Sequence, residues 1–175
     1  VDGQAAASFL CSNTYFDTIR IAHFRVNTST GSTLKSYGFE GCTFRACEEG
    51  SSIQLLNTSL IDGFRIEGGT IRSNFGSGIL QSASGDNLTG LIVTGVTFQN
   101  NNSNNDSLSG DVVVRADASI INSNTFSGGG ALGSCVRLLS GGDNNIATIN
   151  NMNASTCTTK IADGGAGNIT TGNLL

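Results

Sequence analysis

Two glutamates and two arginines share one spacing, and together their side chains could act on a sugar polymer. The positions of Glu40 and Glu67 differ by 67 − 40 = 27, and those of Arg45 and Arg72 differ by 72 − 45 = 27. If the chain returns to the same place in space at this interval, the members of each pair become neighbours, and we expect the two arginines to lie a few residues along the same face as the two glutamates. Two adjacent carboxylates can provide the acid and the base of glycoside hydrolysis, because each disfavours ionisation of the other. An arginine could bind the carboxylate of an acidic sugar through two parallel hydrogen bonds.

A structural interpretation of the same four residues stands beside the catalytic one. Stacked glutamates and arginines can form an exposed ionic ladder, in which the arginines screen the like charges, and such surface pairs contribute little stability. One row spacing is also slightly shorter than the roughly 5–5.5 Å between the carboxyl groups of a retaining hydrolase. Glu40 and Glu67 are therefore our predicted catalytic residues and Arg45 and Arg72 our predicted substrate-binding residues, with the ladder as the alternative.

The other reactive side chains do not indicate a metal or a cofactor, and we expect neither. The single histidine, His23, has no second histidine and no suitably spaced cysteines or carboxylates to complete a metal site or a nucleophilic triad. The five cysteines are Cys11, Cys42, Cys47, Cys135 and Cys157. Cys47 and Cys157 are about four coils apart in the expected register, too far for a disulfide. Reduced thiols are therefore expected, which indicates assembly in a reducing cytoplasm.

A repeat that runs through most of the chain must position these residues. A segment of the form Ile-x-x-Gly/Asn-x-Thr-Phe recurs, with anchors at Phe44, Ile71, Phe98, Phe126 and Ala154. The successive anchor positions differ by 71 − 44 = 27, 98 − 71 = 27, 126 − 98 = 28 and 154 − 126 = 28. A fixed period of this size with strand-forming residues predicts a solenoid.

A second short apolar segment accompanies each copy of the repeat and closes the coil. These segments are aliphatic or β-branched and are bounded by Gly, Ser, Asn or Asp, as is typical of strands between tight turns. They begin at Ile53, Ile79, Val112, Val136 and Ile161. We therefore predict an all-β stack of about six or seven coils.

Alternation along the strands predicts rows of stacked side chains about 4.8 Å apart. The predicted inward rows are Phe24, Phe44, Ile71, Phe98, Phe126, Ala154 and Cys42, Gly69, Val96, Asn124, Met152. The predicted outward rows are His23, Thr43, Thr70, Thr97, Thr125, then Arg25, Arg45, Arg72, Gln99, Ser127, and finally Glu40, Glu67, Thr94, Asn122, Asn150. Asn27, Asn74 and Asn101 are expected to share a corner with Cys47 and Cys157, where stacked amides can bond to one another.

Charge and composition exclude several classes of partner. The formal net charge is −4, the Lys and Arg residues form no run, and we therefore expect no nucleic-acid partner. No stretch approaches the roughly eighteen apolar residues of a membrane span, so we expect no membrane insertion. The length predicts one domain over residues 1–175, and the absent initiator Met favours a segment of a longer chain.

The central coils resemble a known repeat. The segments Ser77–Leu80, Asp86–Leu88 and Leu91–Asn101, and again Ser134–Leu138 and Asn144–Met152, are similar to the repeat of the pectin-lyase-like superfamily. The likeness extends from about Thr18 onward and implies a right-handed parallel β-helix. Members of this superfamily include polysaccharide lyases, glycoside hydrolases and the tailspikes of bacteriophages.

The resemblance leaves two functions open. The first is a bacteriophage tail spike or tail fibre, a homotrimer that binds a bacterial surface polysaccharide, contacts other virion tail proteins and is assembled in the host cytoplasm. Whether such a spike also depolymerises the glycan is left open. The second is a secreted polysaccharide lyase or glycoside hydrolase that acts as a monomer. Free cysteines and few charges favour the first. The polar insertion Asn100–Gly110 is either a recognition loop or a tolerated insertion.

Overall fold

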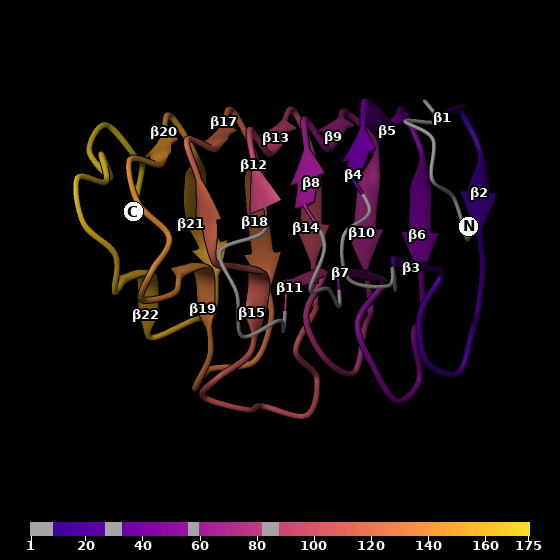
Figure 1. The fold of residues 1–175 in the computed structure, drawn as a ribbon. Coiled ribbons are helices and arrows are strands. Elements are labelled where there is room, and N and C mark those ends of the chain that lie inside the picture. The colour runs from indigo at the N-terminus through magenta and orange to yellow at the C-terminus, as the bar shows by residue number, and fades with distance from the viewer. Residues whose placement is uncertain (1–8, 27–32, 56–59, 82–87) are drawn as a thin grey trace.

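The protein is a parallel β-solenoid of about five turns (Figure 1). The computed structural model describes residues 9–26, 33–55, 60–81 and 88–175, and within these ranges the regular elements are all strands. The predicted all-β solenoid is thus confirmed, with slightly fewer coils than the six or seven expected. The last stretch of chain adds isolated bridges, Ile146 with Ile169 and Asn151 with Leu174, in place of full strands.

Four parallel sheets form the walls of the solenoid. The first sheet contains β1 (Phe9–Ser12), β5 (Tyr37–Glu40), β9 (Arg65–Glu67), β13 (Ile92–Thr94), β17 (Ile120–Asn122) and β20 (Ile146–Thr148). The second contains β2 (Tyr15–Phe16), β6 (Thr43–Arg45), β10 (Thr70–Arg72), β14 (Thr97–Gln99), β18 (Thr125–Gly128) and β21 (Asn151–Ser155).

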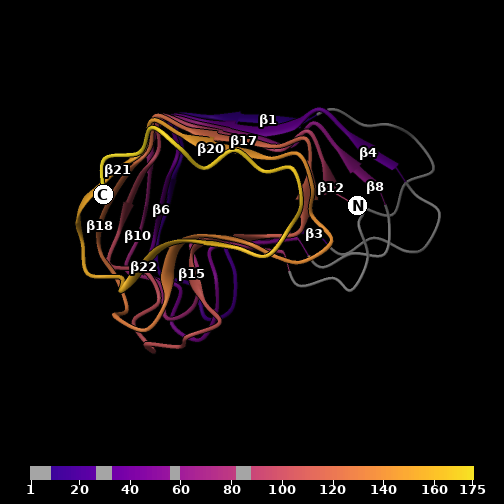
Figure 2. The same ribbon diagram turned by 90° about the vertical axis from the view of Figure 1, so that its left-hand side faces the viewer.

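The third and fourth sheets complete each coil. The third contains β3 (Phe24–Val26), β7 (Ile53–Leu55), β11 (Ile79–Gln81), β15 (Gly110–Val114), β19 (Ser134–Leu138) and β22 (Thr159–Asp163). The fourth contains β4 (Thr33–Lys35), β8 (Leu60–Asp62), β12 (Leu88–Thr89) and β16 (Ala116–Asp117). Figure 2 looks along the stack and shows the sheets meeting at corners, with loops projecting beside β15.

The register of the central coils is the one that the repeat predicts. Phe44 pairs with Ile71, Ile71 with Phe98, and Phe98 with Phe126. All four side chains are fully buried, and the rings of Phe98 and Phe126 stack with centroids 5.0 Å apart. The repeat interval is therefore the distance along the chain between successive residues of one inward row in the second sheet. In this row a large apolar side chain fills the core of each central coil.

The predicted rows are wrong at their amino-terminal end. Phe16, not Phe24, pairs with Phe44, and the two rings stack at 4.7 Å. Phe24 belongs to β3 of the third sheet and pairs with Ile53. His23 and Arg25 consequently leave the predicted outward rows, and Tyr15 takes the place next to Thr43. Phe16 lies 44 − 16 = 28 residues before Phe44, which is one repeat, whereas Phe24 lies only 20 before it and, after a corner, belongs to the next sheet.

The predicted rows are also wrong at their carboxyl-terminal end. Thr125 pairs with Asn151, but Ser127 pairs with Ala154, so β21 carries one extra residue in a bulge. Met152 is fully buried whereas Ala154 is exposed. The last inward step therefore runs from Phe126 to Met152 and is shorter than the predicted step to Ala154. Asn150 likewise leaves the outward row, because Thr148 pairs with Asn122.

Buried asparagines connect successive coils at the corners. At the corner between the second and third sheets, Asn74 Nδ2 donates to Asn101 Oδ1 (2.6 Å), and Asn74 Oδ1 accepts the Cys47 N–H (3.0 Å). The predicted amide corner is confirmed for Asn74 and Asn101, while Asn27 lies outside the described residues. Each amide satisfies backbone or side-chain groups that would otherwise be buried without a partner.

Two further amide ladders were not predicted. At the corner between the first and second sheets, Asn124 Nδ2 donates to Asn150 Oδ1 (3.1 Å), and Asn150 Nδ2 donates to Asn173 Oδ1 (3.0 Å). A third ladder links Asn145 Nδ2 to Asn168 Oδ1 (3.1 Å). The corners are therefore built on side-chain amides that bridge one coil to the next.

All five cysteines are free thiols. Among the described residues, no helix is long and apolar enough to cross a membrane.

Candidate functional site

The predicted catalytic glutamates are neighbours on the first sheet. Glu40 ends β5, Glu67 ends β9, and the register pairs the two residues on adjacent coils. Glu40 is exposed and Glu67 is half-buried. The charge of Glu67 is already compensated, because Arg65 Nη2 lies 3.1 Å from Glu67 Oε1. The carboxylate pair is thus present in space, with an arginine of the same strand as its nearest cation.

The predicted arginines are also neighbours, but on a different sheet. Arg45 and Arg72 pair between β6 and β10 of the second sheet, around the corner from the two glutamates. The expectation that all four side chains share one face is therefore wrong. The turn at Gly41, which has a positive φ of 61°, redirects the chain between Glu40 and Arg45. The Arg45 guanidinium group instead faces Asp17, with 3.5 Å between Arg45 Nη1 and Asp17 Oδ1.

A hollow of about 360 Å³ lies at the polar insertion that follows the second sheet. Its lining consists of Asn100, Asn101, Asn102, Ser103, Asn105, Gly129, Gly130 and Ala131. The loop is held by its own hydrogen bonds, since Asn102 Oδ1 accepts the Asp106 N–H (3.0 Å) and Asn105 Oδ1 accepts the Leu132 N–H (2.8 Å). The insertion therefore presents an ordered, amide-rich concave surface.

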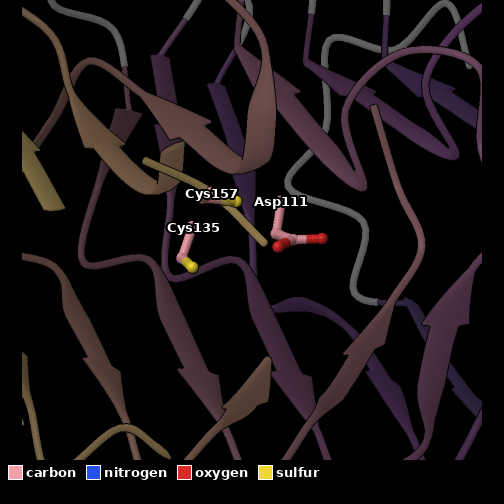
Figure 3. Close-up of side chains that lie close together, drawn as sticks. All are labelled: Asp111, Cys135 and Cys157. Atoms are coloured by element: carbon pink, nitrogen blue, oxygen red, sulfur yellow. The ribbon is translucent and has the colours of Figure 1, made fainter. Parts of the chain in front are cut away.

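A second cluster of reactive groups is buried next to this hollow. Figure 3 shows the side chains of Asp111, Cys135 and Cys157 gathered together, and their oxygen and sulfur atoms all lie within 4.8 Å of one another. Asp111 lies in β15 and Cys135 in β19, on adjacent strands of the third sheet, and Cys157 precedes β22. Asn101, which lines the hollow, donates its Nδ2–H to Asp111 Oδ1 (2.7 Å).

The surroundings of the cluster shift the pKa of all three groups. Burial raises the pKa of Asp111 well above its usual 3.8, and the hydrogen bond from Asn101 offsets part of this effect. Interaction with the Cys135 thiol lowers the pKa of Cys157 to about 7, whereas the same contact and burial raise the pKa of Cys135. The structure thus places a thiol with a lowered pKa beside a carboxyl group whose pKa burial raises.

This cluster was not predicted from the sequence. Asp111 follows the polar insertion, and the three positions differ by 135 − 111 = 24 and 157 − 135 = 22, which match neither each other nor the repeat. The pairing of β15 with β19 could have revealed part of the cluster. Gly110 pairs with Ser134, and this register places Asp111 opposite Cys135.

Comparisons with known proteins do not place this chain in a family. Models of known protein families, curated proteins and solved structures each gave no match.

Proposed function

We propose that this chain is a β-solenoid domain of a bacteriophage tail spike or tail fibre, related in architecture to pectin-lyase-like β-helices, which attaches the virion to a surface polysaccharide of its host. The amide-lined hollow at Asn100–Asn105 and Gly129–Ala131 carries this proposal. Asparagine amides both donate and accept hydrogen bonds, which matches the hydroxyl groups of a glycan. Loops on a rigid solenoid are also common sites of recognition.

Exposed apolar side chains beside the hollow support self-association as a homotrimer. Phe75, Leu108 and Leu132 are 43%, 67% and 61% exposed. Leu108 belongs to the insertion, and Phe75 and Leu132 are joined to it, because the Asn104 N–H donates to the Phe75 carbonyl and Asn105 Oδ1 accepts the Leu132 N–H. Large exposed apolar groups that gather on one side are typical of protein interfaces. Five free thiols are consistent with assembly in a reducing host cytoplasm.

A pair of tryptophan substitutions tests glycan binding at the hollow. Ser103→Trp would fill the hollow from an exposed position, and Thr125→Trp would place the same side chain on the exposed face of β18. Binding to a panel of purified capsular polysaccharides and lipopolysaccharides is measured by calorimetry. We expect Ser103→Trp to weaken binding at least about tenfold, and Thr125→Trp to bind as the unchanged protein does.

The outcome is interpreted together with the molar mass of each variant. A Ser103→Trp protein that keeps its oligomeric state and binds glycan normally would exclude the hollow as the binding site. If no polysaccharide of the panel binds the unchanged protein, the attachment function itself fails.

A secreted monomeric polysaccharide lyase or glycoside hydrolase is the second candidate, and the pairing of Glu40 with Glu67 favours it. Its test is the double variant Glu40→Gln/Glu67→Gln, assayed for release of reducing ends or unsaturated sugars. We expect cleavage to be lost while the far-ultraviolet circular dichroism is unchanged, because both side chains lie on the surface side of the sheet. Cleavage that persists in the folded double variant would remove both glutamates from the site.

A further inference from the structure

We propose that Asp111, Cys135 and Cys157 form a binding site for one zinc ion, buried in the wall of the solenoid. Their three ligand atoms lie within 4.8 Å of one another and come from three successive coils. In a tetrahedral zinc site with Zn–S bonds of about 2.3 Å, neighbouring ligand atoms are roughly 3.5–3.8 Å apart. Side-chain rotations that close the cluster by about an ångström would therefore bring the three ligand atoms to coordination distance of one ion.

The type of ligand selects the metal. Thiolates favour zinc and other thiophilic ions over magnesium and calcium, which prefer oxygen ligands. Two cysteines and one carboxylate leave a fourth position. Ser155 is buried beside it, and its hydroxyl interacts with both Cys135 and Cys157. The Ser155 hydroxyl or a water molecule would fill the fourth position.

The charge balance of the cluster favours a divalent cation. Asp111 is only 2% exposed, and among the described residues no cation pairs with its carboxylate. Lys160 is the nearby positive charge on the thiol side, where its Nζ donates to Ser155 Oγ (2.7 Å) and stabilises the Cys157 thiolate. Two thiolates, one carboxylate, one zinc ion and one ammonium group sum to zero formal charge. Zinc binding would release the remaining thiol and carboxyl protons to solvent.

Neighbouring residues already orient the ligands. Asn101 holds Asp111 Oδ1 through its Nδ2–H, and the same amide accepts a hydrogen bond from Asn74. A metal ligand held by a second hydrogen-bonding group is a common feature of zinc sites. Asn101 and Gly129 also line the hollow, so a zinc ion here would fix the base of that surface. The site itself does not depend on the proposed glycan binding.

Cobalt substitution tests the site in the intact chain. The reduced protein is stripped with a chelator and titrated with Co²⁺ under anaerobic conditions. We expect one Co²⁺ per chain, an intense near-ultraviolet thiolate-to-cobalt band, visible bands of tetrahedral cobalt, and displacement by one equivalent of Zn²⁺. X-ray absorption of the zinc-loaded protein should find two sulfur ligands at about 2.3 Å. No thiolate-to-cobalt band, or fewer than two sulfur ligands, would overturn the proposal.

Substitutions assign the ligands. We expect Cys157→Ser to bind Co²⁺ at least about 100-fold more weakly and Asp111→Asn at least about tenfold more weakly. Cys42→Ser is the matched control, since Cys42 is also buried but lies outside the cluster, and it should bind normally. Unchanged affinity in folded Cys157→Ser would refute the assignment. A protein that is purified with a Cys135–Cys157 disulfide, seen as an intact mass about 2 Da lower, would also refute it.

Discussion

Three ion pairs join charged side chains at the surface of the part of the solenoid that the structure describes. The described ion pairs are Arg20–Glu49, Arg45–Asp17 and Arg65–Glu67, with N–O distances of 2.9, 3.5 and 3.1 Å. All are largely exposed, so they contribute little to stability. A half-buried titratable group is a more sensitive reporter of the folded state, and His23 is such a group.

His23 predicts a loss of stability in mildly acidic solution. Its Nε2–H donates to the Arg45 carbonyl (2.9 Å), and burial lowers its pKa below the usual 6.5, against the opposing effects of that carbonyl and of Asp17. In the unfolded chain His23 is protonated near pH 6.5, whereas in the folded chain its protonation requires a lower pH. The contribution of His23 to the free energy of unfolding should therefore fall as the pH is lowered from about 7 to 5.

Urea unfolding of the unchanged protein and of His23→Gln, at both pH values, checks this prediction. The variant should show a flatter pH dependence, because it lacks the titrating ring. The Asp17 and Asp106 carboxyl groups, whose pKa values are lowered from 3.8, titrate at more acidic pH. The raised pKa of Asp111 acts in the opposite direction to that of His23, and it is common to both proteins, so the difference between their slopes isolates His23. Equal slopes for the two proteins would show that another group is responsible.

At the scale of elements, the corners determine how one strand leads into the next. The strands are short, most of them with two to four residues, so each coil depends on several changes of direction. Two devices make these turns. Buried asparagine ladders satisfy polar groups between coils, and residues with positive φ, mostly Gly, Asn and Ser, reverse the local direction of the backbone.

Loss of one ladder amide should destabilise the whole stack. Asn124 Oδ1 accepts the Val96 N–H (2.9 Å), and its Nδ2 donates to the Val93 carbonyl (3.0 Å). Asn124→Ala leaves these buried groups without partners, so we expect a loss of at least about 2 kcal/mol in the free energy of unfolding. Asn122→Ala, on the outward side of the adjacent strand, should cost less than about 0.5 kcal/mol. Denaturant midpoints measure both, and similar losses would contradict the ladder's role.

Alanine substitutions at two glycines distinguish the cost of backbone strain from the cost of a steric clash. Gly63 and Gly69 have positive φ values of 74° and 81°, but a Cβ at Gly69 would lie 2.0 Å from the Cys42 carbonyl oxygen, whereas one at Gly63 would meet nothing within 4 Å. Gly63→Ala should cost about 1–2 kcal/mol through strain alone. Gly69→Ala should cost several kcal/mol more or prevent folding. Midpoints of thermal unfolding compare the two, and equal losses would rule out the clash.

For the whole molecule, the proposed spike predicts a defined assembly. Light scattering coupled to size exclusion should give a trimer, with three times the chain mass of 17.9 kDa. Leu132→Arg should shift it to monomers, because Leu132 is 61% exposed beside the hollow and an arginine there would disrupt apolar packing. Leu60→Arg, at a position 40% exposed on the fourth sheet, is the control and should stay trimeric. An unchanged protein that is monomeric would favour the secreted enzyme.

The sequence by itself determined the solenoid, its central register and the neighbouring pairs Glu40–Glu67 and Arg45–Arg72. It could do so because parallel strands in register place residues of one type at a constant spacing, so the inward row of Phe44, Ile71 and Phe98 is directly readable. The prediction was wrong at Phe24, which lies 44 − 24 = 20 residues before Phe44 and so departs from the repeat, whereas the true partner Phe16 keeps it at 44 − 16 = 28. It was also wrong at Ala154, where a bulge breaks the constant spacing.

Only the tertiary structure decided which residues share a face or a cluster. The glutamate and arginine pairs lie on two sheets, because a glycine turn between them changes the direction of the chain. Asp111 and Cys135 meet because the pairing of β15 with β19 places them opposite each other, although the loops between the strands of the third sheet vary in length. Cys157 joins them from the corner that precedes β22, outside the strand register, which places Lys160 opposite Cys135. Loop length alters the spacing along the sequence but leaves the stacking in space unchanged, and so the cluster is visible only in the folded chain.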